Sequence, residues 1–425
     1  MHPGNRRNLI ERLSTISENL STPTATFTRR VLRMGAADAY WALVDDIADS
    51  YDIVIDRLFK EWHDTFTKSR IETSVNEMLA CAASSGGDSD VIRAMLDDLT
   101  AFVEAYDEEF TAYVPIGGLL DTGGLPDDGL AFGALRLRAI TQPLRNALLA
   151  RLETTIDRSP ASEAQKARSK NELRSLMQRN YSNTVCSEFR AVAEPERAWE
   201  RAIEATDKVI DPLRFAAANL SPLEHHITIG ALENIASIGH IPLVVPSDDS
   251  RPAPVTMTHT WPDSFELSVA TVQAMRDIGA FTLADVAAAP NATPFERDVL
   301  RGLHWFAHSQ TQKEFSNKVI SLSISLEVLL TPREQDESVT GSIADAVALL
   351  IGDTLTERLR WKRETVRLYG VRSGITHGRD PEIKKEDIVE LIVMCGTVIR
   401  TLAGRRSEFN ERSELMRWIE ERKLG

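Results

Sequence analysis

The sequence has few cysteines and no long apolar run. Only three cysteines occur in 425 residues, and Cys81, Cys186 and Cys395 lie far apart. They form neither a CxxC pair nor a disulfide framework, so we expect reduced, mostly buried thiols. No stretch approaches the ~18 consecutive apolar residues of a membrane-spanning helix. The first residues are charged and lack the apolar core of a secretion signal. We therefore expect a cytoplasmic protein with no membrane partner.

The signatures of several enzyme classes are also missing. No GxSxG turn and no GK[ST] phosphate loop occur in the sequence. His304 and His308 are four residues apart, but the glutamate of HExxH is absent and no third metal ligand is evident. The sequence therefore predicts neither a metal site nor a cofactor, and these histidines are expected in the core or on the surface.

An excess of positive charge is lacking as well. The chain has 49 Lys and Arg against 63 Asp and Glu, a net charge of -14. Phosphate contacts need basic side chains, so an acidic surface disfavours RNA binding in general. Residues 357–372 are a local exception, with six basic and two acidic side chains. This segment indicates either a solvated helix face or an RNA-binding groove, for which the candidate contacts are Arg358, Lys362, Arg363 and Arg367.

The distribution of proline, glycine and apolar residues predicts a mainly α-helical protein. We expect an N-terminal helical region of unknown role over 1–220, and a short joint with extended or β segments over 221–290. A C-terminal helical bundle is expected over 291–404, followed by a helical tail over 405–425. The five prolines of residues 240–262 are the clearest sign of the irregular joint.

Within the N-terminal region, the apolar pattern predicts long helices. Apolar residues recur at steps of three and four from Trp41 to Trp62, in a segment of 36–84 that lacks proline and glycine. This predicts one long helix, packed within the domain or used as a dimer contact. Two further helices are expected over 131–157 and 161–193.

The C-terminal segment contains clearer helix boundaries. Thr293 and Glu296 form a capping-box pair that predicts a helix start at Pro294. Helices are expected over 294–309, 311–330, 341–351, 354–371 and 384–403. Glu327 stands in an otherwise apolar helix, so it either faces solvent or has a basic partner from the motif region.

The segment Arg372-Ser373-Gly374-Ile375-Thr376-His377 separates two of these helices. The order LRGLHWFAHS, ISLSISLEVLL, SIADAVALLIG and RLYGVRSGITHG resembles the Apea-like HEPN family over about residues 294–404. The resemblance implies a compact helical bundle and an RX4-6H motif with Arg372 and His377 as functional residues. It also implies an association with bacterial defence against phage, and metal-independent RNA cleavage by many HEPN proteins.

Arginine and histidine suffice for this chemistry because RNA supplies its own 2′-OH nucleophile. His377 would transfer protons near neutral pH, and Arg372 would stabilise charge on the phosphate. Ser373 or Thr376 could add a hydrogen bond, and Tyr369 or Trp361 could stack on bases if they are not core residues. Positions five apart on a helix are separated by ~140°. Either Gly374 bends the segment or arginine's length closes the gap; the resemblance to HEPN nucleases implies a third answer, in which two copies share one cleft.

Two alternatives to catalysis remain open at this stage. In the first alternative, the HEPN-like segment is a dimerisation or binding module without activity. In the second, it is a helical adaptor in a defence complex. The predicted partners are RNA, a second copy of the chain in a homodimer or larger homo-oligomer, and a trigger molecule or phage protein sensed by the N-terminal region.

Overall fold

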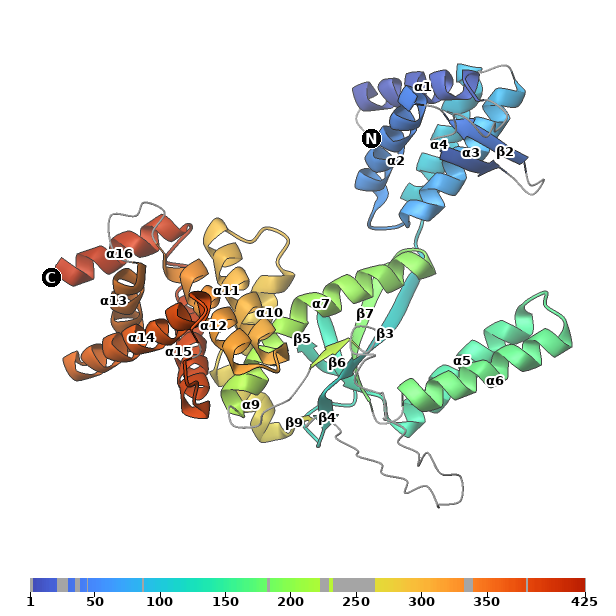
Figure 1. Ribbon diagram of the computed structural model, residues 1–425. Helices are drawn as coiled ribbons and strands as arrows, with labels where there is room; N and C mark the ends of the chain where they lie inside the picture. The colour runs from blue at the N-terminus through green and yellow to red at the C-terminus, as the bar shows by residue number, and fades with distance from the viewer. Residues whose placement is uncertain are drawn as a thin grey trace, which may run out of the picture. The chain divides into compact units, whose positions relative to one another are not determined.

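The computed structural model describes residues 3–20, 30–34, 39–43, 45–85, 88–181, 184–221, 229–231, 264–331, 339–379 and 381–424. The protein is mainly α-helical, as the sequence predicts (Figure 1). None of its described helices is long and apolar enough to cross a membrane. The helices are α1 (Pro3–Glu18), α2 (Asp45–Trp62), α3 (Lys68–Ser84), α4 (Ser89–Glu104), α5 (Gln142–Arg158), α6 (Glu163–Asn180), α7 (Pro195–Leu220), α9 (Val269–Asp277), α10 (Ala280–Ala288), α11 (Pro294–Thr311), α12 (Phe315–Leu330), α13 (Val339–Ile351), α14 (Leu355–Thr376), α15 (Lys385–Gly404) and α16 (Arg412–Leu424).

The strands of the described residues form three small sheets. They are β1 (Arg30–Met34), β2 (Ala39–Leu43), β3 (Glu109–Gly117), β4 (Leu119–Asp121), β5 (Leu130–Phe132), β6 (Leu135–Ala139), β7 (Val185–Val192), β8 (Gly230–Ala231) and β9 (Phe265–Leu267). The largest sheet has the order β5-β6-β7-β3-β8, while β1 pairs with β2 and β4 pairs with β9. The β5-β6 and β6-β7 pairs are antiparallel, and β4-β9 is parallel.

The chain divides into two compact units. The first comprises 1–112 and 190–202, and the second comprises 113–189 and 203–425. Each unit has its own buried apolar cluster. This division differs from the predicted boundaries at 220, 290 and 404, because the sheet segments of 113–189 and the helices after residue 264 bury their apolar side chains in one common core.

The first unit is built on α1 to α4, which pack around one apolar core (Figure 1). The predicted long helix over 36–84 is instead strand β2 followed by α2 and α3, with a break at residues 63–67. Tyr51, Ile55 and Leu58 of the three-four pattern are fully buried in this core. The pattern therefore serves packing within the unit, at least for these side chains.

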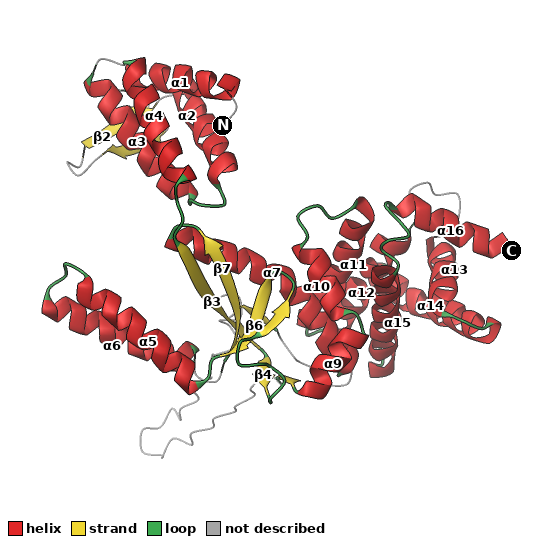
Figure 2. Cartoon of the chain, turned by 180° about the vertical axis from the view of Figure 1, so that it is seen from behind, coloured by secondary structure: helices red, strands yellow, loops and turns green. Residues whose placement is uncertain are grey.

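The second unit contains strands where helices were predicted. Residues 130–139 form β5 and β6, and 185–192 form β7, whereas the sequence analysis expected helices over 131–157 and 161–193. Antiparallel pairing sets Leu137 opposite Ser187, and Leu135 and Leu137 are buried on one face. The alternation of LRLRA has the two-residue period of a strand. Figure 2 shows β3, β6 and β7 side by side, with α7 next to them.

The predicted joint over 221–290 is only partly irregular. Residues 222–228 and 232–263, including the proline-rich part, lie outside the described residues. After them, β9, α9 and α10 place Phe265, Met275 and Leu283 in the core of the second unit. The segment from 264 onward is therefore part of a packed structure.

The C-terminal bundle follows the predicted order of helices. Thr293 and Glu296 form the expected capping box at the start of α11, with both reciprocal hydrogen bonds present. Ser325 in α12 donates a 2.7 Å hydrogen bond to the carbonyl of Gly302 in α11, which marks a close approach of the two helices. The predicted tail contains α16, which buries Leu415 and Ile419.

Gly302 provides a test of this packing. A Cβ at position 302 would lie 2.6 Å from Cγ of the buried Leu329, so Gly302→Ala should lower the free energy of unfolding by about 1–3 kcal/mol. Gly370 in α14 has no atom within 4 Å of the corresponding position, so Gly370→Ala should raise it by about 0.5–1 kcal/mol. Urea denaturation measures both changes, and equal effects at the two positions would contradict the packing.

Candidate catalytic site at the end of helix α14

The predicted motif lies inside a helix and at its end. α14 continues through Gly374 to Thr376, and His377 is its C-cap residue. Of the alternatives for bringing Arg372 and His377 together, a bend at Gly374 is not found, because α14 is continuous through this residue. Gly374 is buried, and a Cβ there would lie 3.3 Å from Cγ of Pro381. The small residue therefore lets the chain turn back closely against α14.

The end of α14 is fixed by a Schellman motif. The N–H of Arg379 donates to the carbonyl of Gly374 at 2.9 Å, and the N–H of Gly378 donates to the carbonyl of Ile375 at 3.1 Å. Gly378 has φ +70°, a conformation that glycine adopts without a steric penalty. This local sequence ends the helix directly after His377, whose side chain is exposed.

Arg372 lies next to Glu327 of α12. Its Nη2 is 3.1 Å from Oε1 of Glu327, and the two side chains are 33% and 25% exposed. Burial raises the pKa of the Glu327 carboxyl, while the charge of Arg372 opposes this rise. The sequence left two readings open for Glu327, and the structure selects the one with a partner from the motif.

Arg372 and His377 are not brought together within one chain. On a continuous helix they point about 140° apart, and no contact between their side chains occurs among the described residues. Thr376 donates its hydroxyl to backbone carbonyls of its own helix, those of Arg372 and Ser373, each at 3.2 Å. Ser373 is exposed next to Arg372, so it is the better placed of the two hydroxyls for an external ligand.

Tyr369 is a core residue. It is 4% exposed, and its hydroxyl donates to the carbonyl of Ser323 at 3.1 Å. Burial raises the pKa of Tyr369 well above its ordinary value. A ring in this position cannot stack on RNA, so the prediction of Tyr369 as an RNA contact is wrong.

Most of the predicted basic patch is neutralised by carboxylates or used in helix packing. Arg358 donates from Nε to the carbonyl of Gly352 at 3.0 Å, at the end of α13. Lys362 lies 2.5 Å from Asp345. Arg367 contacts three carboxylates, those of Glu364, Asp387 and Glu390, and its hydrogen bonds to the first two raise its pKa still further.

Arg363 differs from the other predicted contacts. It is exposed and has no ion pair within the part of the chain that the structure describes. Among Arg358, Lys362, Arg363 and Arg367, it is therefore the side chain most available to a phosphate group. Apart from Glu364 of α14 itself, the carboxylates come from α13 and α15, so a count of charges along α14 alone overstates the positive potential of this helix.

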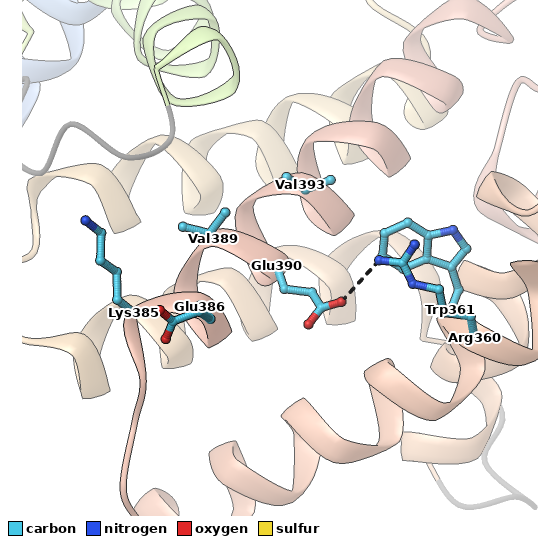
Figure 3. A pocket seen from close by; sticks show the side chains of 7 residues that line it. All are labelled: Arg360, Trp361, Lys385, Glu386, Val389, Glu390 and Val393. Carbon is cyan, nitrogen blue, oxygen red and sulfur yellow. Dashed lines mark ion pairs between the residues drawn. The ribbon is translucent and has the colours of Figure 1, made fainter.

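A surface pocket of about 380 Å³ lies between α14 and α15 (Figure 3). Trp361, Val389 and Val393 supply its apolar lining, and Arg360, Lys385, Glu386 and Glu390 supply charges of both signs. The guanidinium of Arg360 lies 5.0 Å from the ring centroid of Trp361 and 3.6 Å from Glu390. Trp361 is thus the predicted stacking residue that keeps access to a surface pocket.

No family model, curated protein or solved structure matches the chain. Among the described residues, no group of three or more His, Cys, Asp or Glu side chains is arranged to hold a metal ion. The three cysteines form no disulfide: Cys81 is exposed, and Cys186 and Cys395 are buried.

The Arg372–Glu327 pair can be tested by a double-mutant cycle. The variants are Arg372→Gln, Glu327→Gln and the double variant. Because both side chains are partly exposed, we expect a coupling free energy of about 1 kcal/mol, the low part of the range for residues in contact. Urea denaturation at pH 7 measures it. Zero coupling would mean that the pair does not contribute in solution.

The ionisation of the Asp387 carboxyl should make the stability of the protein depend on pH. Burial alone would raise its pKa, but hydrogen bonds from Arg367 and from the N–H of Lys384 lower it below its ordinary value. Because the pKa of Asp387 is lower in the folded protein than in the unfolded one, its ionised form stabilises the fold. This stabilisation is fully present at pH values above the unfolded-state pKa of ~3.9. It is lost as the pH falls through the folded-state pKa. Asp387→Asn should cost about 1–3 kcal/mol at pH 6 and flatten the decline below pH 4.

The control for this prediction is Asp285→Asn, which changes an exposed carboxylate of α10. Urea midpoints between pH 6 and pH 3 compare the variants with the parent protein. An unchanged pH profile in Asp387→Asn would show that another group governs the decline in stability.

Proposed function

We propose that this protein is a metal-independent endoribonuclease of the HEPN type, in which Arg372 and His377 act on the RNA. The observation that carries the proposal is the arrangement at the end of α14. Glu327 holds the Arg372 cation at 3.1 Å, and the Schellman motif ends the helix at an exposed histidine. A positioned cation and an exposed imidazole are the two groups that cleavage through a 2′-OH requires.

In the proposed reaction the ribose 2′-oxygen attacks the adjacent phosphorus as a histidine removes its proton. The P–O5′ bond breaks, and the departing 5′-oxygen takes a proton from a second general acid. The products are a 2′,3′-cyclic phosphate and a 5′-OH end. Arg372 stabilises charge on the nonbridging oxygens, Glu327 positions Arg372, and Ser373 donates a further hydrogen bond.

The separation of Arg372 and His377 around α14 favours a homodimeric site. One continuous helix points the two side chains about 140° apart. A second copy related by a twofold axis would place the His377 of one chain beside the Arg372 of the other. Two histidines in one cleft would then supply the base and the acid, which one chain cannot do alone.

The biological setting follows from the resemblance alone. We propose that the activity serves bacterial defence against phage in the cytoplasm, and that a trigger molecule or phage protein acts through the N-terminal region. The strong acidity of the chain outside the bundle is consistent with restraint of RNA binding before the trigger arrives.

A non-catalytic binding module is the second candidate function. It is favoured by the ion pairs that occupy Lys362 and Arg367, since a neutralised patch attracts RNA weakly. The pocket beside Trp361 also carries charges of both signs, which suits contact with a second copy of the same surface better than contact with a polyanion.

Cleavage of a mixed RNA pool in the presence of EDTA tests the proposal. The parent protein should produce 2′,3′-cyclic phosphate ends, and Arg372→Ala and His377→Ala should each lower the rate at least about 100-fold. The matched control is His63→Ala, which removes another exposed histidine directly after a helix. Cleavage that survives His377→Ala would contradict the proposal.

If the folded parent protein does not cleave RNA, its effect on cell growth would be measured next. Growth inhibition that disappears in His377→Ala would support a nuclease that needs an activator. Absence of both cleavage and His377-dependent growth inhibition would favour the binding module.

A further inference from the structure

The first unit contains a cavity of about 650 Å³ between α1 and α4. Three arginines line it, Arg6, Arg7 and Arg93, together with the hydroxyl residues Ser14 and Ser89. This volume lies in the range of small-molecule sites, ~300–1,000 Å³. The cavity is distant in sequence from the α14 motif, and its chemistry is a separate question from RNA cleavage.

Helical spacing places these groups on facing surfaces. Arg6, Ile10 and Ser14 are four residues apart and share one face of α1. Ser89 and Arg93 are likewise four apart at the start of α4. Ile10 is 8% exposed and gives the cavity an apolar floor. Guanidinium and hydroxyl groups from two helices therefore line the cavity above its apolar floor.

Three arginines and one carboxylate line the cavity, and each arginine has an exposed carboxylate partner. Glu11 is a lining carboxylate, and it pairs with Arg7 at 3.0 Å. Arg6 pairs with Asp97 and Arg93 with Asp90, all with side chains that are 37% exposed or more. Exposed pairs of this kind contribute ~0–1 kcal/mol. A phosphate group that accepts two hydrogen bonds from each guanidinium can therefore displace them.

Two further observations point to a ligand at this place. Among the described residues, the buried hydroxyl oxygen of Ser14 has no hydrogen-bond partner, although buried polar groups in proteins are nearly always paired. The first turn of α4 also lies at the cavity, since Ser89 is its first residue. The Asp88 carboxylate already accepts a hydrogen bond from the N–H of Asp90, so a phosphate group here would use the remaining N–H groups of the first turn and the helix dipole.

We propose that this cavity binds a small molecule that carries two or more phosphate groups. Arg6 and Arg93 bind the phosphate oxygens, Arg7 closes the outer side, and the Ser14 hydroxyl donates to the ligand. The proposal is independent of the proposed nuclease activity. It gives the first unit a ligand class, which composition and helical pattern alone did not suggest.

Calorimetric titration of the full-length protein tests the proposal, with sodium pyrophosphate, ATP and adenosine as probes. Pyrophosphate or ATP should bind, and adenosine, which has no phosphate, should not. Arg6→Gln and Arg93→Gln should each weaken binding about tenfold or more, the loss typical for a hydrogen bond to a charged group. Ser14→Ala should weaken binding severalfold.

The matched control is Arg168→Gln in α6, where an exposed arginine pairs with Glu172 outside the cavity. Its affinity should equal that of the parent protein. Absence of binding of both pyrophosphate and ATP would overturn the proposal, as would equal affinity in the folded Arg6→Gln and Arg93→Gln variants. If circular dichroism shows that these variants are unfolded, unchanged affinity in Ser14→Ala overturns it. RNA cleavage is not a readout in this experiment.

Discussion

The C-terminal bundle depends on how one helix with many charged side chains, α14, is held in place. α14 buries only Thr365, Leu368, Tyr369 and Gly374 of its 22 residues. Trp361, Val371 and Ile375 add partly buried apolar contacts. Ion pairs supply further attachment: Arg372 pairs with α12, Lys362 with α13 and Arg367 with α15. Pairs that are partly buried gain more than fully exposed ones, because solvent screens them less. The same pairs reduce the positive charge that α14 offers to a ligand, while the Schellman motif fixes the end of the helix.

Local sequence signals predicted the helices of the bundle better than the sheet of the second unit. The Thr293–Glu296 capping box is a short-range signal, and it marks the start of α11 correctly. The β7 segment VCSEFRAV has four consecutive buried residues, and such a run does not distinguish a strand from a buried helix. Pairing with β6, some fifty residues earlier in the chain, and with β3 on the other side decides between them. The alternation of apolar and charged residues in LRLRA indicates a strand, and the helix predicted over 131–157 did not take it into account.

The candidate site was predictable to the extent that it depends on one helix. A carboxylate in the apolar surface of α12 needs a cation, and Arg372 provides it. Two of the three carboxylate partners of Arg367, however, come from residues 387 and 390 on α15, and charge counts along one segment cannot reveal them. Tyr369 shows the same limit, since its burial follows from the packing of α14 against α12.

Two separate cores have a consequence for any link between ligand binding and activity. A ligand of the first unit stabilises that unit by RT ln(1 + [L]/Kd), and it affects the second unit only if the two conformational equilibria are coupled. The chain passes from one unit to the other at residues 112–113, 189–190 and 202–203, within β3, β7 and α7. A regular strand or helix transmits a displacement more directly than a loose linker does. These three elements are therefore the places where substitutions should alter such coupling without changing either site.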